Sequence, residues 1–271
     1  MPCGNGFACW GCGLLPEFKF CACRYRARKG LVTPSSLVPL SEPGSFFITG
    51  TGTDVGKTWL TCALLRHWRA QGLAPRAFKP VLSGFNPAEA AASDAGQLLA
   101  ALGRSIDATA WDDIAPWRFS APLSPDMAAA REGRRIDFDA LVGFTRRIAS
   151  AVSMDTDSHN FLTVIEGVGG VMVPLDEQHT VRDWIAASGL PCILVAGSYL
   201  GSLSHTLTAL ESLRKVGAGV AAIVVNESPE SSVSLADTIA TLHHHVGGVN
   251  LVTISRAAPQ IGVTELAFLL G

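Results

Sequence analysis

One nine-residue segment limits the possible folds of this chain more than any other feature. Residues 50–58 read Gly-Thr-Gly-Thr-Asp-Val-Gly-Lys-Thr, directly after an apolar run at 45–50 and before a helical pattern at 57–70. A glycine-rich turn between a strand and a helix lets backbone amides approach phosphate oxygens, while the lysine reaches the β- and γ-phosphates and the hydroxyl ligates Mg²⁺. The segment therefore predicts a phosphate-binding loop in an α/β protein.

The spacing of this loop is longer than usual by one residue. Gly50 and Gly56 are separated by five residues, whereas the standard motif has about four between its first glycine and the Gly-Lys pair. The Lys57 and Thr58 side chains still follow in the required order, so we expect Lys57 to bind phosphate and Thr58 to bind the metal. The loop residues expected to contact the nucleotide are Thr53, Asp54, Val55 and Gly56.

The rest of the chain alternates apolar runs with helical patterns, which is typical of repeated βαβ units. The runs lack polar alternation, as do strands that are buried on both faces. We therefore predict a doubly wound α/β fold of the phosphate-loop NTPase type, one domain over 45–271, with a mostly parallel sheet, helices on both faces and ligands at the carboxyl ends of the strands. Strands are expected at 45–50, 76–81, 161–166, 191–197, 219–226 and 249–254, and helices at 57–70, 94–102, 137–152, 181–187, 204–216 and 233–244.

Composition excludes several classes of protein. With 48% hydrophobic and 16% charged residues among 271, the chain is neither disordered, collagenous nor a coiled coil. The net charge of −2 lacks the positive field that non-specific binding to nucleic acids or anionic membranes needs. No apolar run approaches the ~20 residues of a membrane span. We expect small-molecule partners, and no nucleic acid or membrane.

Residues 1–44 differ in composition from the remainder. They hold five of the seven cysteines and five basic residues against two acidic ones. A zinc site at Cys9, Cys12, Cys21 and Cys23 and a targeting peptide are two possible interpretations. A disordered, basic, cysteine-rich extension is the interpretation that we favour. The two other cysteines give no disulfide framework, which predicts a reducing compartment and a cytoplasmic protein.

Further polar residues stand where the predicted strands end. Lys79 follows the second apolar run, and at a strand end it would face the same crevice as the phosphate loop. Glu166 ends the third run, where phosphate-loop NTPases usually carry an acidic metal-site residue. Asp94 is either a metal ligand or a residue that favours the helix dipole. Asn226 ends the fifth run, where it is either a ligand-binding residue or an ordinary turn asparagine.

Several of these segments resemble motifs of the dethiobiotin synthetase family, a branch of the phosphate-loop proteins related to MinD and ParA. The loop resembles Gly-Thr-x-Thr-x-Val-Gly-Lys-Thr, with Gly52 in place of a common acidic residue. Residues 79–84 resemble Lys-Pro-Val-x-Ser-Gly, 93–95 Ser-Asp-Ala, 166–170 Glu-Gly-Ala-Gly-Gly and 224–226 Val-x-Asn. Residues 120–125 resemble, more weakly, a Pro-x-Ser-Pro segment at the family's substrate site.

The resemblance implies a role for each matching residue. Lys79 and Ser83 would contact the substrate's carbamate and the transferred phosphoryl group. Thr58, Asp94 and Glu166 would hold Mg²⁺, and Asn226 would recognise adenine. The remaining nucleotide contacts would come from the glycines after the third strand, Gly169 and Gly170.

Residues 200–205 resemble the family's Leu-Gly-x-x-Asn-His helix start, with Ser204 in place of asparagine. In the family, amides at this helix start receive the carboxylate tail of a substrate that is bound mainly to the other subunit. The resemblance therefore implies that Gly201 and Ser204 bind the substrate tail and that the protein is a homodimer.

The implied activity is an ATP- and Mg²⁺-dependent ligase reaction of biotin biosynthesis. 7,8-Diaminopelargonic acid captures CO₂ as a carbamate, ATP phosphorylates it, and the second amine displaces phosphate to give dethiobiotin. One alternative is a nucleotide switch like ParA or MinD, although the loop lacks the early lysine of that group at Thr51. Another alternative is a related ATP-dependent amidating synthase.

Overall fold

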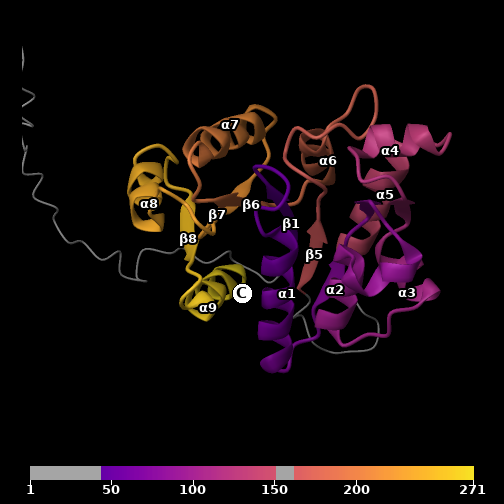
Figure 1. Cartoon of the computed structure of the whole chain (residues 1–271), viewed down its shortest axis with the longest axis horizontal. Helices are drawn as coiled ribbons and strands as arrows, with labels where there is room; N and C mark the ends of the chain where they lie inside the picture. Colours follow the sequence, from indigo (N-terminus) through magenta and orange to yellow (C-terminus); the bar gives the residue numbers. More distant parts are fainter. Residues whose placement is uncertain (1–43, 151–161) are drawn as a thin grey trace, which may run out of the picture. The chain divides into compact units, whose positions relative to one another are not determined.

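A sheet of six parallel strands lies at the centre of residues 44–150 and 162–271, the part of the chain that this computed structural model describes (Figure 1). The strand order is β2-β5-β1-β6-β7-β8. All strand pairs of this sheet are parallel, as the uninterrupted apolar runs predict. The strands are β1 (Ser45–Gly50), β2 (Arg76–Phe78), β5 (Thr163–Glu166), β6 (Cys192–Gly197), β7 (Val220–Asn226) and β8 (Asn250–Ile254).

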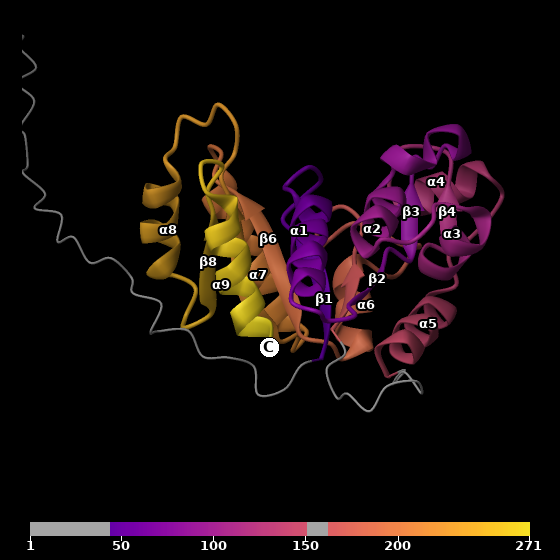
Figure 2. The same cartoon turned by 90° about the horizontal axis from the view of Figure 1, so that it is seen from below.

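Helices cover both faces of the sheet (Figures 1 and 2). One face carries α1 (Lys57–Ala70), α2 (Asp94–Leu102) and α9 (Pro259–Leu270), and the other carries α5 (Phe138–Ser150), α6 (Val181–Ser188), α7 (Ser202–Lys215) and α8 (Leu235–His243). This arrangement confirms the predicted doubly wound α/β class. The expected extension at 1–44, apart from Gly44, lies outside the described residues.

Aromatic packing fixes β1, which leads into the phosphate loop. The ring of Phe47 on β1 meets Trp184 of α6 edge to face, with centroids 4.7 Å apart and an interplanar angle of 88°. Both side chains are fully buried, and the Trp184 indole donates a hydrogen bond of 2.9 Å to Thr145 of α5. Such an aromatic pair stabilises a fold by about 0.5–1.5 kcal/mol beyond the buried area. The base of the loop is therefore held rigidly.

The strand expected at 76–81 is divided in the structure. Pro80 has no backbone N–H to give to a sheet, and the Lys79 N–H donates to the Ile114 carbonyl instead of to β5. The chain leaves the main sheet there and continues as β3 (Val81–Ser83), which pairs with β4 (Trp117–Phe119) in a separate two-stranded parallel sheet. The sequence prediction of one strand was wrong at this point.

Short elements that the sequence analysis did not predict surround this small sheet. They are the 3₁₀ segment η2 (Pro87–Ala92), α3 (Ala108–Ile114) and α4 (Pro125–Arg131). Each has at most seven residues, which is too few for a helical hydrophobic period to stand out. α3 contacts β2, and α4 contacts β3 and β4, so these elements lie beside the β2 edge of the main sheet.

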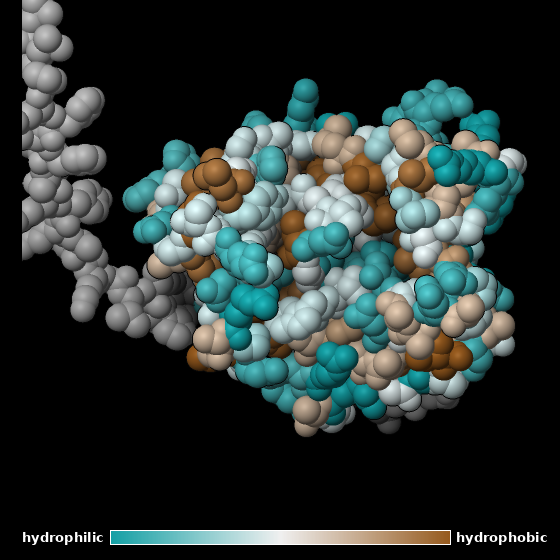
Figure 3. All heavy atoms as spheres, viewed as in Figure 1, coloured by the Kyte–Doolittle hydropathy of each residue, from teal (hydrophilic) through white to brown (hydrophobic). Residues whose placement is uncertain are grey.

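On the face that Figure 3 shows, hydrophilic residues are interspersed with smaller groups of hydrophobic ones. None of the helices in the described ranges is both long enough and apolar enough to cross a bilayer.

Candidate active site

The phosphate loop connects β1 to α1 and takes its shape from unusual backbone angles. The Thr51 N–H donates to the Val195 carbonyl of β6, which anchors the start of the loop at 2.9 Å. Gly56 has a φ of 91° and caps α1, and a Cβ at this position would collide with the side-chain amide of Asn226. Gly56 is therefore required both by its backbone conformation and by a close neighbour.

Lys57 is the first residue of α1 and is almost fully buried. Its Nζ donates to the Gly52 carbonyl at 2.7 Å, so the side chain folds back along the loop. Burial and then the positive charge of Lys79 lower the pKa of Lys57 to about 8. An anion in the loop would relieve both effects, and this environment therefore suits the binding of phosphate.

Four polar side chains from separate elements meet beside the loop. Glu166, at the end of β5, is fully buried, and its Oε1 accepts hydrogen bonds from Thr58 at 2.7 Å and from Lys79 Nζ at 2.8 Å. Lys79 Nζ is also 3.0 Å from Asp94 Oδ2, at the start of α2. The cluster contains two carboxylates, one ammonium and one hydroxyl.

In this cluster, charge pairing has a larger effect than burial on the pKa values of Lys79 and Asp94. Burial alone would lower the pKa of Lys79, but the carboxylates of Glu166 and Asp94 raise it above its usual range. Burial would likewise raise the pKa of Asp94, but the charge and hydrogen bond of Lys79 hold it below its usual range. Asp94 does not cap α2, because the Ser93 side chain accepts the capping bond from the Gly96 N–H. The Asp94 carboxylate points instead into the cluster.

The donor atoms of the cluster fit a hard divalent cation. Glu166 Oε1 and Asp94 Oδ2 lie within 3.0 Å of one ammonium nitrogen and therefore converge on one place, and the Thr58 hydroxyl lies 2.7 Å from Glu166 Oε1. Oxygen ligands with two negative charges are what Mg²⁺ prefers, together with phosphate oxygens and water.

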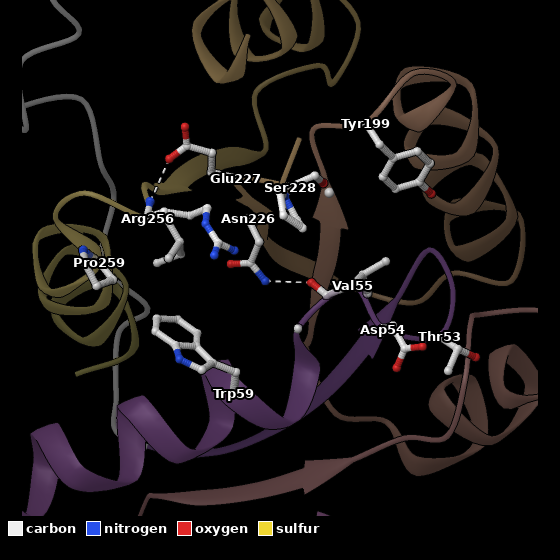
Figure 4. Close-up of a pocket in the computed structure, with 14 residues that line it drawn as sticks. Thr53, Asp54, Val55, Trp59, Tyr199, Asn226, Glu227, Ser228, Arg256 and Pro259 are labelled. Atoms are coloured by element: carbon white, nitrogen blue, oxygen red, sulfur yellow. Dashed lines mark hydrogen bonds between the residues drawn. The ribbon is translucent and has the colours of Figure 1, made fainter. Parts of the chain in front are cut away.

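Two cavities open on opposite sides of the phosphate loop. The first, of about 710 Å³, lies over the carboxyl ends of β6, β7 and β8 (Figure 4). The second, of about 650 Å³, lies between the loop, β3 and the segment before α4. Both are lined by Thr53, Asp54, Gly56 and Trp59. The loop is thus a shared wall, at which groups held in the two cavities would meet.

Asn226 connects the first cavity to the loop. Its Nδ2 donates to the Val55 carbonyl at 2.7 Å, and its Oδ1 is buried without a hydrogen-bond partner among the described residues (Figure 4). A buried acceptor without a partner is costly unless a ligand supplies a donor. The exocyclic amine of a nucleobase is such a donor.

The first cavity also contains residues that the sequence analysis missed. Trp59 of α1, 44% exposed, and Arg256, in the loop between β8 and α9, point into it (Figure 4). Glu227 holds that loop in place, because its Oε2 accepts from the Ser255 hydroxyl at 3.0 Å and from the Arg256 N–H at 2.7 Å. The residues 255–259 match no nucleotide-binding pattern, so only their position identifies them.

The second cavity collects the residues expected at the substrate. Lys79 and Ser83 line it, and so does Ser124 of the segment 120–125. The hydroxyls of Ser83 and Ser124 are buried without partners among the described residues, and they are therefore available to a polar ligand. Gly169 lines this cavity as well, with a φ of 58°.

Four predicted site residues line neither cavity: Glu166, which is fully buried in the cluster, and Gly170, Gly201 and Ser204. A Cβ on Gly170 would come within 3.2 Å of Thr51 and Gly52 backbone atoms, so this glycine allows the β5 loop to pack against the phosphate loop. Gly201 and Ser204 are exposed at the start of α7. The single chain therefore does not bring these two residues to Lys79 and Ser83.

A parallel α/β sheet with a glycine-rich loop, a buried lysine and an acidic strand end defines a phosphate-loop nucleotide-binding protein. A sequence profile described as an AAA domain matches residues 44–259. The ATP-dependent dethiobiotin synthetase of Acidiphilium cryptum (strain JF-5) is 51% identical over 205 residues, which cover 74% of this chain and 88% of that protein. The enzyme of the same name from Phenylobacterium zucineum (strain HLK1) is 46% identical over 218 residues, covering 80% and 89%.

The chain belongs to the ATP-dependent dethiobiotin synthetase family, whose members are ligase-type enzymes. This membership confirms the resemblance inferred from the motifs. Among solved structures, the MinC:MinD complex of Aquifex aeolicus aligns with a TM-score of 0.46 and 11% identity, covering 83% of this chain and 86% of that one.

Proposed function

We propose that this chain closes the ureido ring of dethiobiotin from 7,8-diaminopelargonic acid and CO₂, with ATP converted to ADP and phosphate. Family membership supports the reaction, and one observation supports its assignment to this site. The two cavities share the phosphate loop as a wall, and Lys57 and Lys79 both line the second cavity, beside that wall. A nucleotide in the first cavity would thereby present its γ-phosphate to a carbamate in the second.

The residues of the chain would act by position and charge. Lys57 and the loop amides from Thr53 to Gly56 would bind the β- and γ-phosphates, and Asn226 Oδ1 would accept from the adenine amine. Lys79 would neutralise the carbamate and the migrating phosphoryl group, which are both anionic. Ser83 would orient the carbamate. Phosphoryl transfer depends mainly on such positioning and neutralisation.

Thr58, Asp94 and Glu166 are the residues that would hold Mg²⁺, and Mg²⁺ would neutralise charge on the β- and γ-phosphates. Metal dependence, like the role of each residue, is part of this proposal. Its support is the oxygen donor set described above.

The same proposal includes a homodimer, in which α7 of one subunit completes the site of the other. Gly201 and Ser204 can bind a substrate tail only across an interface, because they line neither cavity of their own chain. Leu200 beside them is 79% exposed, and Met172, half exposed, accepts a hydrogen bond from Ser212 of α7. A partner would cover these apolar side chains.

Mixing two variant subunits tests this arrangement. A Lys57→Ala subunit and a Ser204→Asp subunit should each be impaired alone, and mixing them should restore activity because one site of the mixed dimer is intact. Sedimentation at micromolar concentration should give a dimer. A monomer, or no recovery on mixing, would contradict the shared site.

Phosphate release tests the function itself. The purified protein should release phosphate from ATP only when diaminopelargonic acid, bicarbonate and Mg²⁺ are all present, because the carbamate is the phosphoryl acceptor. Lys79→Ala should mainly lower kcat, by ~10²–10³, since its charge is needed most during transfer. ATP hydrolysis that ignores the diamine would sink the proposal and favour a nucleotide switch.

We further propose a cytoplasmic enzyme in which residues 1–44 are dispensable. The described chain enters β1 at Ser45, and the profile match begins at residue 44. Removing residues 1–44 should leave the melting temperature and kcat unchanged. A melting temperature lowered by many degrees, or a stoichiometric zinc ion in the full chain, would contradict this proposal.

A further inference from the structure

The two oxygens of Glu166 have different partners. Oε2 lies 2.8 Å from the hydroxyl of Thr61, a fully buried residue of α1 that has no role in the proposed reaction. Oε1 accepts from Thr58 and from Lys79. The Thr61 hydroxyl is also 3.0 Å from the Lys57 carbonyl, but it has one proton, and a carboxylate is the stronger acceptor. Thr61 therefore commits Oε2 to α1 and leaves Oε1 alone facing the cluster.

The place beside Oε1 is taken by an ammonium group. Lys79 Nζ lies 2.8 Å from Glu166 Oε1, 2.8 Å from the Gly167 carbonyl and 3.0 Å from Asp94 Oδ2. An ammonium has three donors, so all three are used. Lys79 is only 2% exposed. In this arrangement it cannot also bind an anion in the second cavity.

We propose that Lys79 and the divalent cation exchange for Glu166 Oε1, and that Thr61 is the positioning residue which orients this oxygen towards the cluster. Because Oε2 is held by Thr61, Glu166 has one oxygen for either cation. A metal that takes Oε1 and Asp94 displaces the Lys79 ammonium, which is then available to the anions of the second cavity. Binding of the metal and release of the Lys79 ammonium towards the substrate are thereby coupled.

This inference rests on the proposed function for the later task of Lys79, but the exchange is a property of the nucleotide-free protein. Its first test is therefore Mn²⁺ binding without nucleotide, measured by electron paramagnetic resonance. Lys79→Met keeps the apolar stem and removes the competing ammonium, so the affinity for Mn²⁺ should rise about tenfold. Unchanged or weaker Mn²⁺ binding would overturn the exchange.

Lys57→Met is the matched control for this measurement. Lys57 is a second buried lysine beside this cluster, but its Nζ contacts the Gly52 carbonyl and neither carboxylate. Its loss changes the local charge equally, and it should raise Mn²⁺ affinity by less than about threefold. Equal gains in the two variants would show a general charge effect and would contradict a specific exchange.

The second test addresses Thr61 by calorimetric titration with a non-hydrolysable ATP analogue, with and without Mg²⁺. Removing a partner that orients a metal ligand typically costs about 10–100-fold in metal affinity. Thr61→Val should therefore reduce the affinity gain from Mg²⁺ by about tenfold, whereas Thr61→Ser should keep it. Equal behaviour of the two variants would contradict the positioning role.

Thr238→Val controls for the loss of a buried threonine hydroxyl. Thr238 of α8 is 1% exposed and, like Thr61, bonds to the carbonyl four residues earlier, but it contacts no carboxylate. It should leave the Mg²⁺ effect unchanged. If Thr61→Val does not fold, Thr61→Ala replaces it in the comparison with Thr61→Ser, and the Lys79→Met titration tests the exchange by itself. If the exchange is found but diamine does not stimulate ATP turnover, the proposed function fails while this inference stands.

Discussion

The two cavities that meet at the phosphate loop are built by different means. In the second cavity Lys79 and Asp94 are already paired, and Lys79 is saturated by Glu166, Asp94 and the Gly167 carbonyl. The first has a buried amide oxygen without a partner, Asn226 Oδ1, whereas the buried groups without partners in the second are the hydroxyls of Ser83 and Ser124 (Figure 4). One side is preorganised around charge, and the other offers a surface that a ligand would complete.

This difference separates two tasks of one substrate-binding site. Charge must be held in place before transfer, since a preorganised site has no reorganisation cost during reaction. Recognition of a base needs only hydrogen bonds and apolar contact, which several arrangements can supply. We therefore expect substitutions on the charged side to change the rate strongly, and substitutions on the base side to change affinity moderately.

The largest effect should come from Lys57. Lys57→Ala removes a buried positive charge that lies against the loop, so it should raise the nucleotide KM and lower kcat, with a combined loss of kcat/KM of ~10²–10³. Steady-state kinetics with saturating diamine measure it. Lys215→Ala, an exposed lysine in the last turn of α7, is the control and should behave as the wild type. A loss of kcat/KM below tenfold for Lys57→Ala would contradict the expectation that substitutions on the charged side have the larger effect.

The same difference explains which parts of the site the sequence predicts. The roles proposed for Lys57, Thr58 and Glu166 require fixed spacing from strand ends, so the motif and the strand pattern locate these residues. In the proposed function Arg256 and Trp59 would contact a base, which tolerates many environments, and no spacing marks them. The division of the strand at Pro80 was missed because apolar pairs, Ala77-Phe78 and Val81-Leu82, stand on both sides of Lys79 and Pro80. Gly201 and Ser204 would need a second chain to be placed.

Asn226→Ala should have the next largest effect. It removes the bond to the Val55 carbonyl and the acceptor offered to the base, and at about 1 kcal/mol for each hydrogen bond the nucleotide affinity should fall roughly 10–30-fold. The kcat at saturating nucleotide should change by less than about twofold, because no transferring atom is contacted. Affinity for pyrophosphate separates the two losses and should fall less than that for ATP. A reduced kcat with unchanged affinity would assign Asn226 to the charged side instead.

The pH dependence of nucleotide binding should be smaller still. Because the pKa of Lys57 is lowered to about 8, the fraction of charged lysine in the free protein falls as pH rises through that value. The positive charge offered to phosphate falls with it, so affinity decreases as pH rises. Between about pH 7 and 9 we expect a decrease of about fivefold for ADP and none for adenosine, measured by calorimetry. A parallel decrease for adenosine would place the titrating group in the base cavity.

Arg256→Ala should give the smallest effect, because its side chain is exposed and water screens its charge. The Arg256 backbone N–H, which the substitution keeps, holds the loop between β8 and α9 to Glu227, and this bond first of all keeps the pKa of Glu227 below its usual range. Only the guanidinium in the cavity is lost, so nucleotide affinity should fall about two- to threefold at low salt.

Salt tests this interpretation of Arg256. Raising the salt concentration to about 0.5 M should remove most of the difference between Arg256→Ala and the wild type, since the Debye length falls below the distance over which an exposed charge acts. The difference for Lys57→Ala should persist, because that ammonium is buried and poorly screened. Arg104→Ala, an exposed arginine paired with Asp113 outside both cavities, controls for a change in net charge. A salt-independent loss of tenfold or more for Arg256→Ala would mean that the base cavity is as preorganised as the charged one, and the contrast between the two sides would not hold.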